Sequence, residues 1–161
     1  MSPTETAGDV MTTDVVTVTP QQNILVASKT LLDRRVSNAP VVDSAGQRQM
    51  LVGFVSERDL MQCYANGMYF HDPETTVAKV MRLHPICVKP VTDIFTLAMI
   101  FMQHEFRHLP VVERGELLGM VSRHDCLGAL LSHYEKWLDA PAGEKVMPDL
   151  ERLFPQQFIV G

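Results

Sequence analysis

Residues Gly53-Phe54-Val55-Ser56-Glu57-Arg58-Asp59 decide the fold of this chain, because the same pattern returns as Gly119-Met120-Val121-Ser122-Arg123-His124-Asp125. The match extends upstream of both stretches, since Pro40-Val41-Val42 recurs 70 positions later as Pro110-Val111-Val112. Two ordered blocks that both occur twice indicate an internal repeat. A repeat has to be recognised before single elements are assigned, because it sets the whole architecture.

The repeat also reaches towards the start of each copy. Val10-Met11 recurs as Val80-Met81, again 70 positions apart. Between the proline block and the glycine block the offset falls to 66, so the first copy is longer there, around residues 44–49. Both copies have turn residues at this point, where insertions are tolerated. The chain therefore divides into a first repeat at 8–66, a linker at 67–76, a second repeat at 77–136 and a tail at 137–161.

Each repeat predicts a strand, a helix, a hairpin and a second helix. The β-branched runs before Pro20 and Pro90 favour strands, at 15–18 and 86–88. Apolar residues at helical spacing favour helices at 22–35 and 92–105, the second with Asp93 as a capping residue. Ser56 and Ser122 then open the last helices. The predicted hairpins pair 39–42 with 50–55 and 109–112 with 117–121, and in the tail 148–154 favours a short helix and 157–160 a short strand.

The composition narrows the function classes. The net charge is -5 and the basic residues are scattered, which disfavours a nucleic-acid binder. The cysteine count is odd, with no C-x-x-C pair among Cys63, Cys87 and Cys126, so we expect neither a disulfide framework nor a zinc site. No stretch approaches the roughly 20 apolar residues of a membrane helix. The first residues carry no secretory signal pattern, so we expect a cytoplasmic protein.

The repeated unit resembles the cystathionine-β-synthase (CBS) domain, and the chain resembles a CBS domain pair, the Bateman-type module. The residues that carry the resemblance lie between about 8 and 136. They are the Val-Met pair, Val18-x-Pro20 or Val88-x-Pro90, an amphipathic helix, Pro-Val-Val, and Gly-x-Val-Ser-x-x-Asp. No single piece is specific, but the ordered set occurs twice.

The resemblance implies a fold and a function. It implies an α/β (α+β) fold, in which two repeats pack through small mixed sheets flanked by helices around a pseudo-two-fold axis and form two clefts. It also implies a homodimer of CBS pairs and a ligand such as AMP, ADP, ATP or S-adenosylmethionine. Regulation by a change of shape is implied, without catalysis and without a required cofactor. Because no effector domain is present, an effector protein would be bound in trans.

The two Ser-x-x-Asp motifs have two interpretations that remain open. Ser56 with Asp59, and Ser122 with Asp125, match a helix-capping box, in which serine and acid satisfy free backbone N–H groups. Alternatively, each aspartate accepts hydrogen bonds from a ribose diol, and the serine and helix N-terminus suit a phosphate. The interpretations are compatible, because a cap would also fix the aspartate.

The residues before each Pro-Val-Val block are not duplicated. The resemblance assigns phosphate contacts to Arg107 and His108, where the first repeat has Ser37 and Asn38. The alternative is a solvated helix end, where cations offset the helix dipole. The family geometry groups Asp59 with Arg107, His108 and His124, and Asp125 with Ser37, Asn38 and Arg58. We therefore predict that the Asp59 site prefers the more phosphorylated ligand.

Adenine needs an apolar slot. The resemblance assigns the lining of such slots to six residues: Val16 and Ile86 at the first strands, with Val36, Phe106, Pro40 and Pro110. Ordinary core packing explains each of them singly as well. His104 and His108 have a helical metal-ligand spacing but no evident third ligand. The sequence contains no phosphate-binding P-loop and no nucleophile elbow, so we expect no catalytic residues.

Two other functions compete with ligand sensing. A structural module would dimerise and bind partners without a ligand, and it would not need Asp59 and Asp125. An enzyme would need a convergent catalytic constellation, which the sequence lacks.

Overall fold

Both predicted hairpins form in the computed structural model, which describes residues 4–147. β1 (Asn38–Ala45) pairs antiparallel with β2 (Arg48–Ser56), and β3 (His108–Glu113) pairs antiparallel with β4 (Glu116–Ser122). Glycines with positive φ, Gly46 and Gly115, make the two turns. The hairpins meet where Met50 pairs with Glu116, so the strand order is β1-β2-β4-β3.

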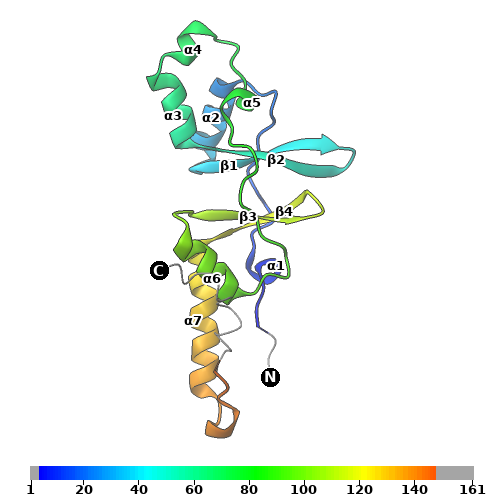
Figure 1. Cartoon of the computed structure of the whole chain (residues 1–161), viewed down its shortest axis with the longest axis vertical. Helices are drawn as coiled ribbons and strands as arrows, with labels where there is room; N and C mark the ends of the chain where they lie inside the picture. Colours follow the sequence, from blue (N-terminus) through cyan, green and yellow to red (C-terminus); the bar gives the residue numbers. More distant parts are fainter. Residues whose placement is uncertain (1–3, 148–161) are drawn as a thin grey trace, which may run out of the picture.

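The helices lie on the outer sides of the two hairpins, as Figure 1 shows. α2 (Ile24–Arg34) and α3 (Glu57–Ala65) cover the first hairpin, and α6 (Ile94–Gln103) and α7 (Arg123–Asp139) cover the second. Asn23 and Asp93 cap α2 and α6 with their side-chain oxygens. The predicted α/β (α+β) tandem with helix-flanked sheets is confirmed.

Each repeat has its own hydrophobic core, because each amphipathic helix buries one face on its own hairpin. Ile24, Ala27 and Leu31 of α2 are buried in the first core. Leu97 and Phe101 of α6 are buried in the second.

The opening segment of each repeat packs on the other repeat. α1 (Ala7–Val10) precedes the first repeat, but Ala7 lies in the second core. α5 (Val77–Val80) precedes the second repeat, but Val77 lies in the first core. The backbone N–H groups of Thr12 and Arg82 then donate to Met120 O and Phe54 O, both at 2.8 Å. The two halves are therefore interlocked, and residues just after these segments lie beside the strands of the other half.

The two strands predicted at 15–18 and 86–88 are wrong, because these segments form only isolated bridges. Residues 15–18 and 86–88 each make one parallel bridge, Val18 to Val41 and Val88 to Val111. The residues before Val18 and Val88 leave the sheet edge and line the clefts described below, so no second pair can form.

The regions outside the repeats are partly described. The linker contains a short helix, α4 (Met68–His71), and Tyr69 packs on the first core. After α7 the chain makes a 3-10 turn, η1 (Ala142–Glu144). The helix predicted at 148–154 and the strand predicted at 157–160 lie outside the described residues. Within residues 4–147, none of the helices combines the length and apolar character that a membrane crossing requires.

Candidate functional site

Both Ser-x-x-Asp motifs form capping boxes. Asp59 Oδ2 accepts from Ser56 N at 2.9 Å and from Ser56 Oγ at 2.6 Å, and Ser56 Oγ accepts from Asp59 N at 3.3 Å. Asp125 Oδ2 accepts from Ser122 N at 2.9 Å and from Ser122 Oγ at 2.6 Å. The capping interpretation is therefore confirmed. In both boxes it uses only Oδ2, so Oδ1 of each carboxylate is left for another donor.

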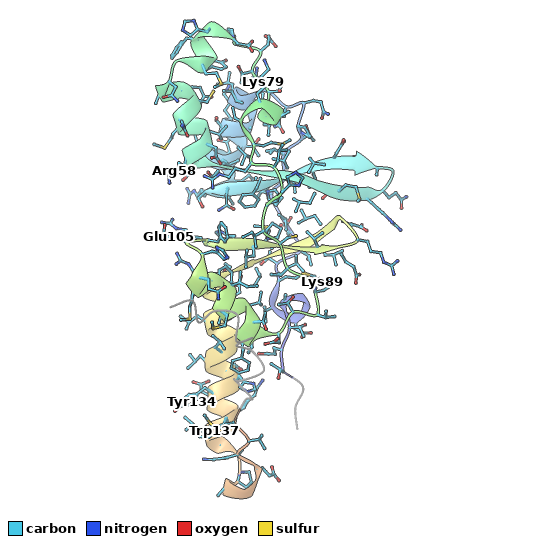
Figure 2. All side chains as sticks on the ribbon, in the orientation of Figure 1. Arg58, Lys79, Lys89, Glu105, Tyr134 and Trp137 are labelled. Atoms are coloured by element: carbon cyan, nitrogen blue, oxygen red, sulfur yellow. The ribbon has the colours of Figure 1, made fainter. Side chains whose placement is uncertain are left out.

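One cleft opens beside each capping box, between the hairpins. The Asp59 cleft has a volume of about 580 Å3 and is lined by residues of both repeats. Its walls are the start of α3 at 56–59, the segment 82–86, the segment 105–108, and Phe54 and Pro110. Figure 2 shows two of its lining residues, Arg58 and Glu105, on opposite sides of the gap between the hairpins.

The Asp125 cleft is smaller, at about 450 Å3. Its walls are the segments 14–16 and 35–38, with Thr12, Pro40, Met120, Ser122 and Asp125. Each wall residue of the Asp125 cleft has its repeat equivalent in the wall of the Asp59 cleft. The offset between equivalents is 70 before the hairpin turn and 66 after it. The two clefts are thus pseudo-symmetric copies, and their sequence differences can be compared position by position.

The charged positions of the two clefts differ. Arg82, His84 and Arg107 of the Asp59 cleft correspond to Thr12, Asp14 and Ser37 of the Asp125 cleft. The reverse difference occurs twice: Glu105 corresponds to Arg35, and Glu57, which also lines the Asp59 cleft, corresponds to Arg123. Three of these five differences make the Asp59 cleft more favourable for an anion.

The six apolar residues predicted for adenine lie three in each cleft. Val16, Val36 and Pro40 line the Asp125 cleft. Ile86, Phe106 and Pro110 line the Asp59 cleft. Their roles towards a ligand stay predictions.

Two placements differ from those expected. Arg58 was predicted beside Asp125, but it lines the Asp59 cleft. Arg58 lies on the first turn of α3, between the capping residues Ser56 and Asp59, and therefore lines the same cleft as they do. His124 was predicted beside Asp59, but it is exposed and lines neither of the two clefts. It lies on the first turn of α7, where Asp125 and not His124 forms the capping box.

Asn38 and His108 form a wall that both clefts share. They are repeat equivalents, and both line both clefts. Asn38 Nδ2 lies 3.1 Å from His108 Nδ1. An amide nitrogen only donates, so this contact is a hydrogen bond when Nδ1 carries no proton, and it is lost when the imidazole is charged. The protonation state of one ring is therefore linked to the geometry of both clefts.

His108 is half-buried, and its surroundings disfavour the charged imidazole. Burial lowers the pKa of His108 from its usual 6.5, Asp125 acts in the opposite direction, and Arg107 and Arg123 lower the pKa further. In the folded state His108 therefore binds a proton less readily than in the unfolded chain.

A pH-dependent loss of stability follows from this shift. Because the folded pKa is lowered, the stability is fully present above the usual histidine pKa and is lost as the pH falls below it. The loss from one histidine cannot exceed about 1.4 kcal/mol per pH unit. His108→Asn, which installs the residue of the first repeat, is expected to lose less stability than the unchanged chain between pH 7 and pH 5. Urea unfolding at both pH values measures the difference, and equal losses would contradict it.

Sequence reasoning missed the cleft residues that come from the crossing segments, Thr12, Asp14, Arg82 and His84. The sequence feature that could have pointed to these residues is the repeated Val-Met pair, which directly precedes Thr12 and Arg82. The pair marks the segment, but nothing in the local pattern says that the segment crosses to the other repeat. Arg82 is the most consequential of these residues, because its Nε donates to Asp59 Oδ1 at 3.1 Å.

No group of three or more His, Cys, Asp or Glu side chains in residues 4–147 is arranged to hold a metal ion. His104 stacks on Phe106 with ring centroids 5.2 Å apart.

Comparison with known proteins identifies the repeat. A family model described as CBS domain matches the chain twice, at residues 7–66 and 77–132. The CBS domain-containing protein YhcV of Bacillus subtilis (strain 168) is 31% identical over 118 residues, which cover 73% of this chain and 79% of that protein.

Solved structures have the same fold. The structure of CBSX2 in complex with AMP has a TM-score of 0.69 and 29% identity, covering 81% of this chain and 98% of that chain. CBSX2 is a CBS-pair protein from Arabidopsis thaliana. The CBS domain pair of protein MJ0100, in complex with 5′-methylthioadenosine and S-adenosyl-L-methionine, has a TM-score of 0.65 at 20% identity, covering 82% of this chain and 99% of that chain.

Proposed function

The chain belongs to the CBS domain family, and on that premise we propose that it is a non-catalytic regulatory module that binds an adenosine-containing ligand between its two repeats. The observation that carries the proposal is the pair of clefts with a capped aspartate in each. Helix capping accounts for Oδ2 of each aspartate and leaves Oδ1 beside the cleft for another donor. The volumes, about 580 and 450 Å3, fall in the range of small-molecule sites.

Each part of such a ligand has a matching group in the Asp59 cleft. Asp59 accepts from the ribose hydroxyls, and the N-terminus of α3 and Arg107 attract the phosphate. Ile86 and Phe106 pack against the adenine. CBSX2, at 29% identity, is a relative solved with AMP, which supports AMP, ADP or ATP as the first ligands to test, followed by S-adenosylmethionine.

The output of the module follows from its interlocked halves. Ligand that contacts Asp59 and Arg107 joins the two repeats across one cleft, so binding favours one angle between the hairpins. The proposal assigns the response to an effector protein bound in trans and places the module in the reducing cytoplasm, which suits the free thiols of Cys63, Cys87 and Cys126.

A second candidate function, dimerisation as a structural module, is favoured by a repeated apolar surface. Leu32 of α2 is 68% exposed, and its equivalent in α6, Met102, is 80% exposed. Met61 of α3 is 68% exposed, and its equivalent in α7, Leu127, is 66% exposed. Apolar side chains exposed at the same positions of both repeats suit a contact with a second copy. This candidate is compatible with ligand binding.

Thermal unfolding with a panel of ligands tests the proposed function. Ligand at 100 times its dissociation constant stabilises the folded state by about 2.7 kcal/mol, so AMP, ADP, ATP or S-adenosylmethionine is expected to raise the melting temperature clearly. The matched control is the double variant Asp59→Asn and Asp125→Asn, which keeps a capping oxygen and removes both charges. It is expected to lose most of the shift. If none of the four ligands raises the melting temperature, the proposed ligand binding is wrong and the dimerisation module is favoured.

A further inference from the structure

Asp59 and Asp125 differ in one contact. Asp59 Oδ1 is paired with Arg82 Nε at 3.1 Å, while Oδ2 is used by the capping box. Within residues 4–147, Asp125 Oδ1 accepts no hydrogen bond, and the residue equivalent to Arg82 is Thr12. Both oxygens of Asp59 thus accept from the protein, which leaves about one acceptor position, while Asp125 keeps Oδ1 entirely free in the described part of the chain.

Arg82 is fixed at its backbone and free at its side chain. Arg82 N donates to Phe54 O at 2.8 Å, and Phe54 N donates to Arg82 O at 3.0 Å, so β2 holds the residue beside the cleft. The Arg82 side chain is 58% exposed, whereas the Asp59 side chain is only 12% exposed. Because the guanidinium is exposed and its backbone is held by β2, Arg82 can turn from Asp59 to another anion in the cleft without moving its main chain.

Displacing Arg82 has a different consequence for different ligands. A ribose hydroxyl that donates to Asp59 competes with Arg82 for Oδ1. An uncharged nucleoside separates the pair and offers the guanidinium no anion in return. A nucleotide supplies a phosphate, which a guanidinium binds through two charge-assisted hydrogen bonds. The exchange from carboxylate to phosphate therefore favours only the phosphorylated ligand.

We propose that Arg82 makes the Asp59 cleft selective for phosphorylated over unphosphorylated adenosine, because it occupies the ribose acceptor until a phosphate offers it another anion. The inference rests on the proposed function and names the residue that sets its ligand class. It also assigns the lower selectivity to the Asp125 cleft, where Thr12 carries no charge.

Calorimetry with adenosine and AMP tests the proposal. The parent is Asp125→Ala, in which the Asp59 cleft is the intact one. Adding Arg82→Thr, which installs the residue of the other repeat, is expected to reduce the ratio of AMP affinity to adenosine affinity by about tenfold. Arg82→Lys, which keeps the charge, is expected to retain most of the ratio. The reciprocal change Thr12→Arg in an Asp59→Ala parent is expected to raise the ratio in the Asp125 cleft.

The outcomes separate the inference from the function on which it rests. If the parent binds AMP and Arg82→Thr leaves the ratio unchanged, the role of Arg82 is overturned and ligand binding stands. If neither ligand binds the unchanged chain, the inference fails, and the proposed function is then decided by ADP, ATP and S-adenosylmethionine in the thermal unfolding series. Circular dichroism checks that each variant is folded. Should Asp125→Ala not fold, Arg82→Thr in the otherwise unchanged chain gives the same ratio at the cleft that binds AMP more tightly.

Discussion

Replacing Gly119 by alanine is expected to lower the free energy of unfolding by about 2–3 kcal/mol, in the upper part of the range for overpacked sites. A Cβ atom at Gly119 would lie 2.7 Å from Thr12 O and 2.8 Å from Met11 Sδ. Thr12 O accepts from Met120 N at 2.9 Å, so the backbone cannot move away without losing a hydrogen bond. The glycine of the repeated motif is therefore required by the segment that crosses over it.

Two other glycines provide matched controls for this prediction. Gly128→Ala meets no atom within 4 Å on the exposed face of α7, and it is expected to stabilise the helix by up to about 1 kcal/mol. Gly53→Ala meets Met81 Sδ at 2.7 Å and Arg82 O at 3.0 Å, and a thioether can move, so a smaller loss is expected. Urea unfolding measures all three variants. A Gly119→Ala chain as stable as the unchanged one would show that the crossing segment is not tightly held.

Asp59→Ala is expected to weaken nucleotide binding in its cleft by about 100-fold or more. Two hydrogen bonds from ribose hydroxyls to a carboxylate contribute together at least about 3 kcal/mol, and each 1.4 kcal/mol is a factor of ten. Asp125→Ala is expected to remove binding from the other cleft only. Because Arg107 and Arg82 line the Asp59 cleft, the Asp59 variant should lose more of the ATP affinity than the Asp125 variant.

Calorimetric titration of both variants with AMP and ATP measures this asymmetry. Each aspartate also caps a helix, so Asp59→Asn and Asp125→Asn are the controls. They keep a capping oxygen and remove the charge, so a loss of affinity in them does not come from loss of the cap. If Asp59→Ala and Asp125→Ala lose equal affinity for both ligands, the clefts are equivalent and the predicted asymmetry is wrong.

Much of the local structure could be predicted from the sequence. The hairpins follow from apolar runs around Gly46 and Gly115, and the helices from apolar residues at helical spacing. The Ser-x-x-Asp boxes could be found because a cap joins residues only three positions apart. The repeat added an independent check, since each pattern occurred twice in the same order.

The contents of the two clefts were harder to predict. Arg58 was assigned to the wrong cleft, and Arg82 and His84 were not assigned to either. Residues 15–18 and 86–88 were predicted as strands because β-branched composition does not distinguish a strand from an extended cleft wall. Of these differences, only the placement of Arg82 and His84 originates in a contact between the repeats, where Arg82 N donates to Phe54 O.

The sequence by itself determined the repeated unit, its hairpin and helices, and the capped aspartate of each copy, because these depend on periodicity and on neighbours a few residues apart. Only the tertiary structure decided that α1 and α5 exchange cores, which brings Thr12 beside Met120 and Arg82 beside Phe54. The physical reason is that both repeats bury apolar residues at equivalent positions, so the local pattern does not tell which core an opening segment packs on. Local patterns are the same in both arrangements, so only the packing of the whole chain selects the one that pairs Arg82 with Asp59.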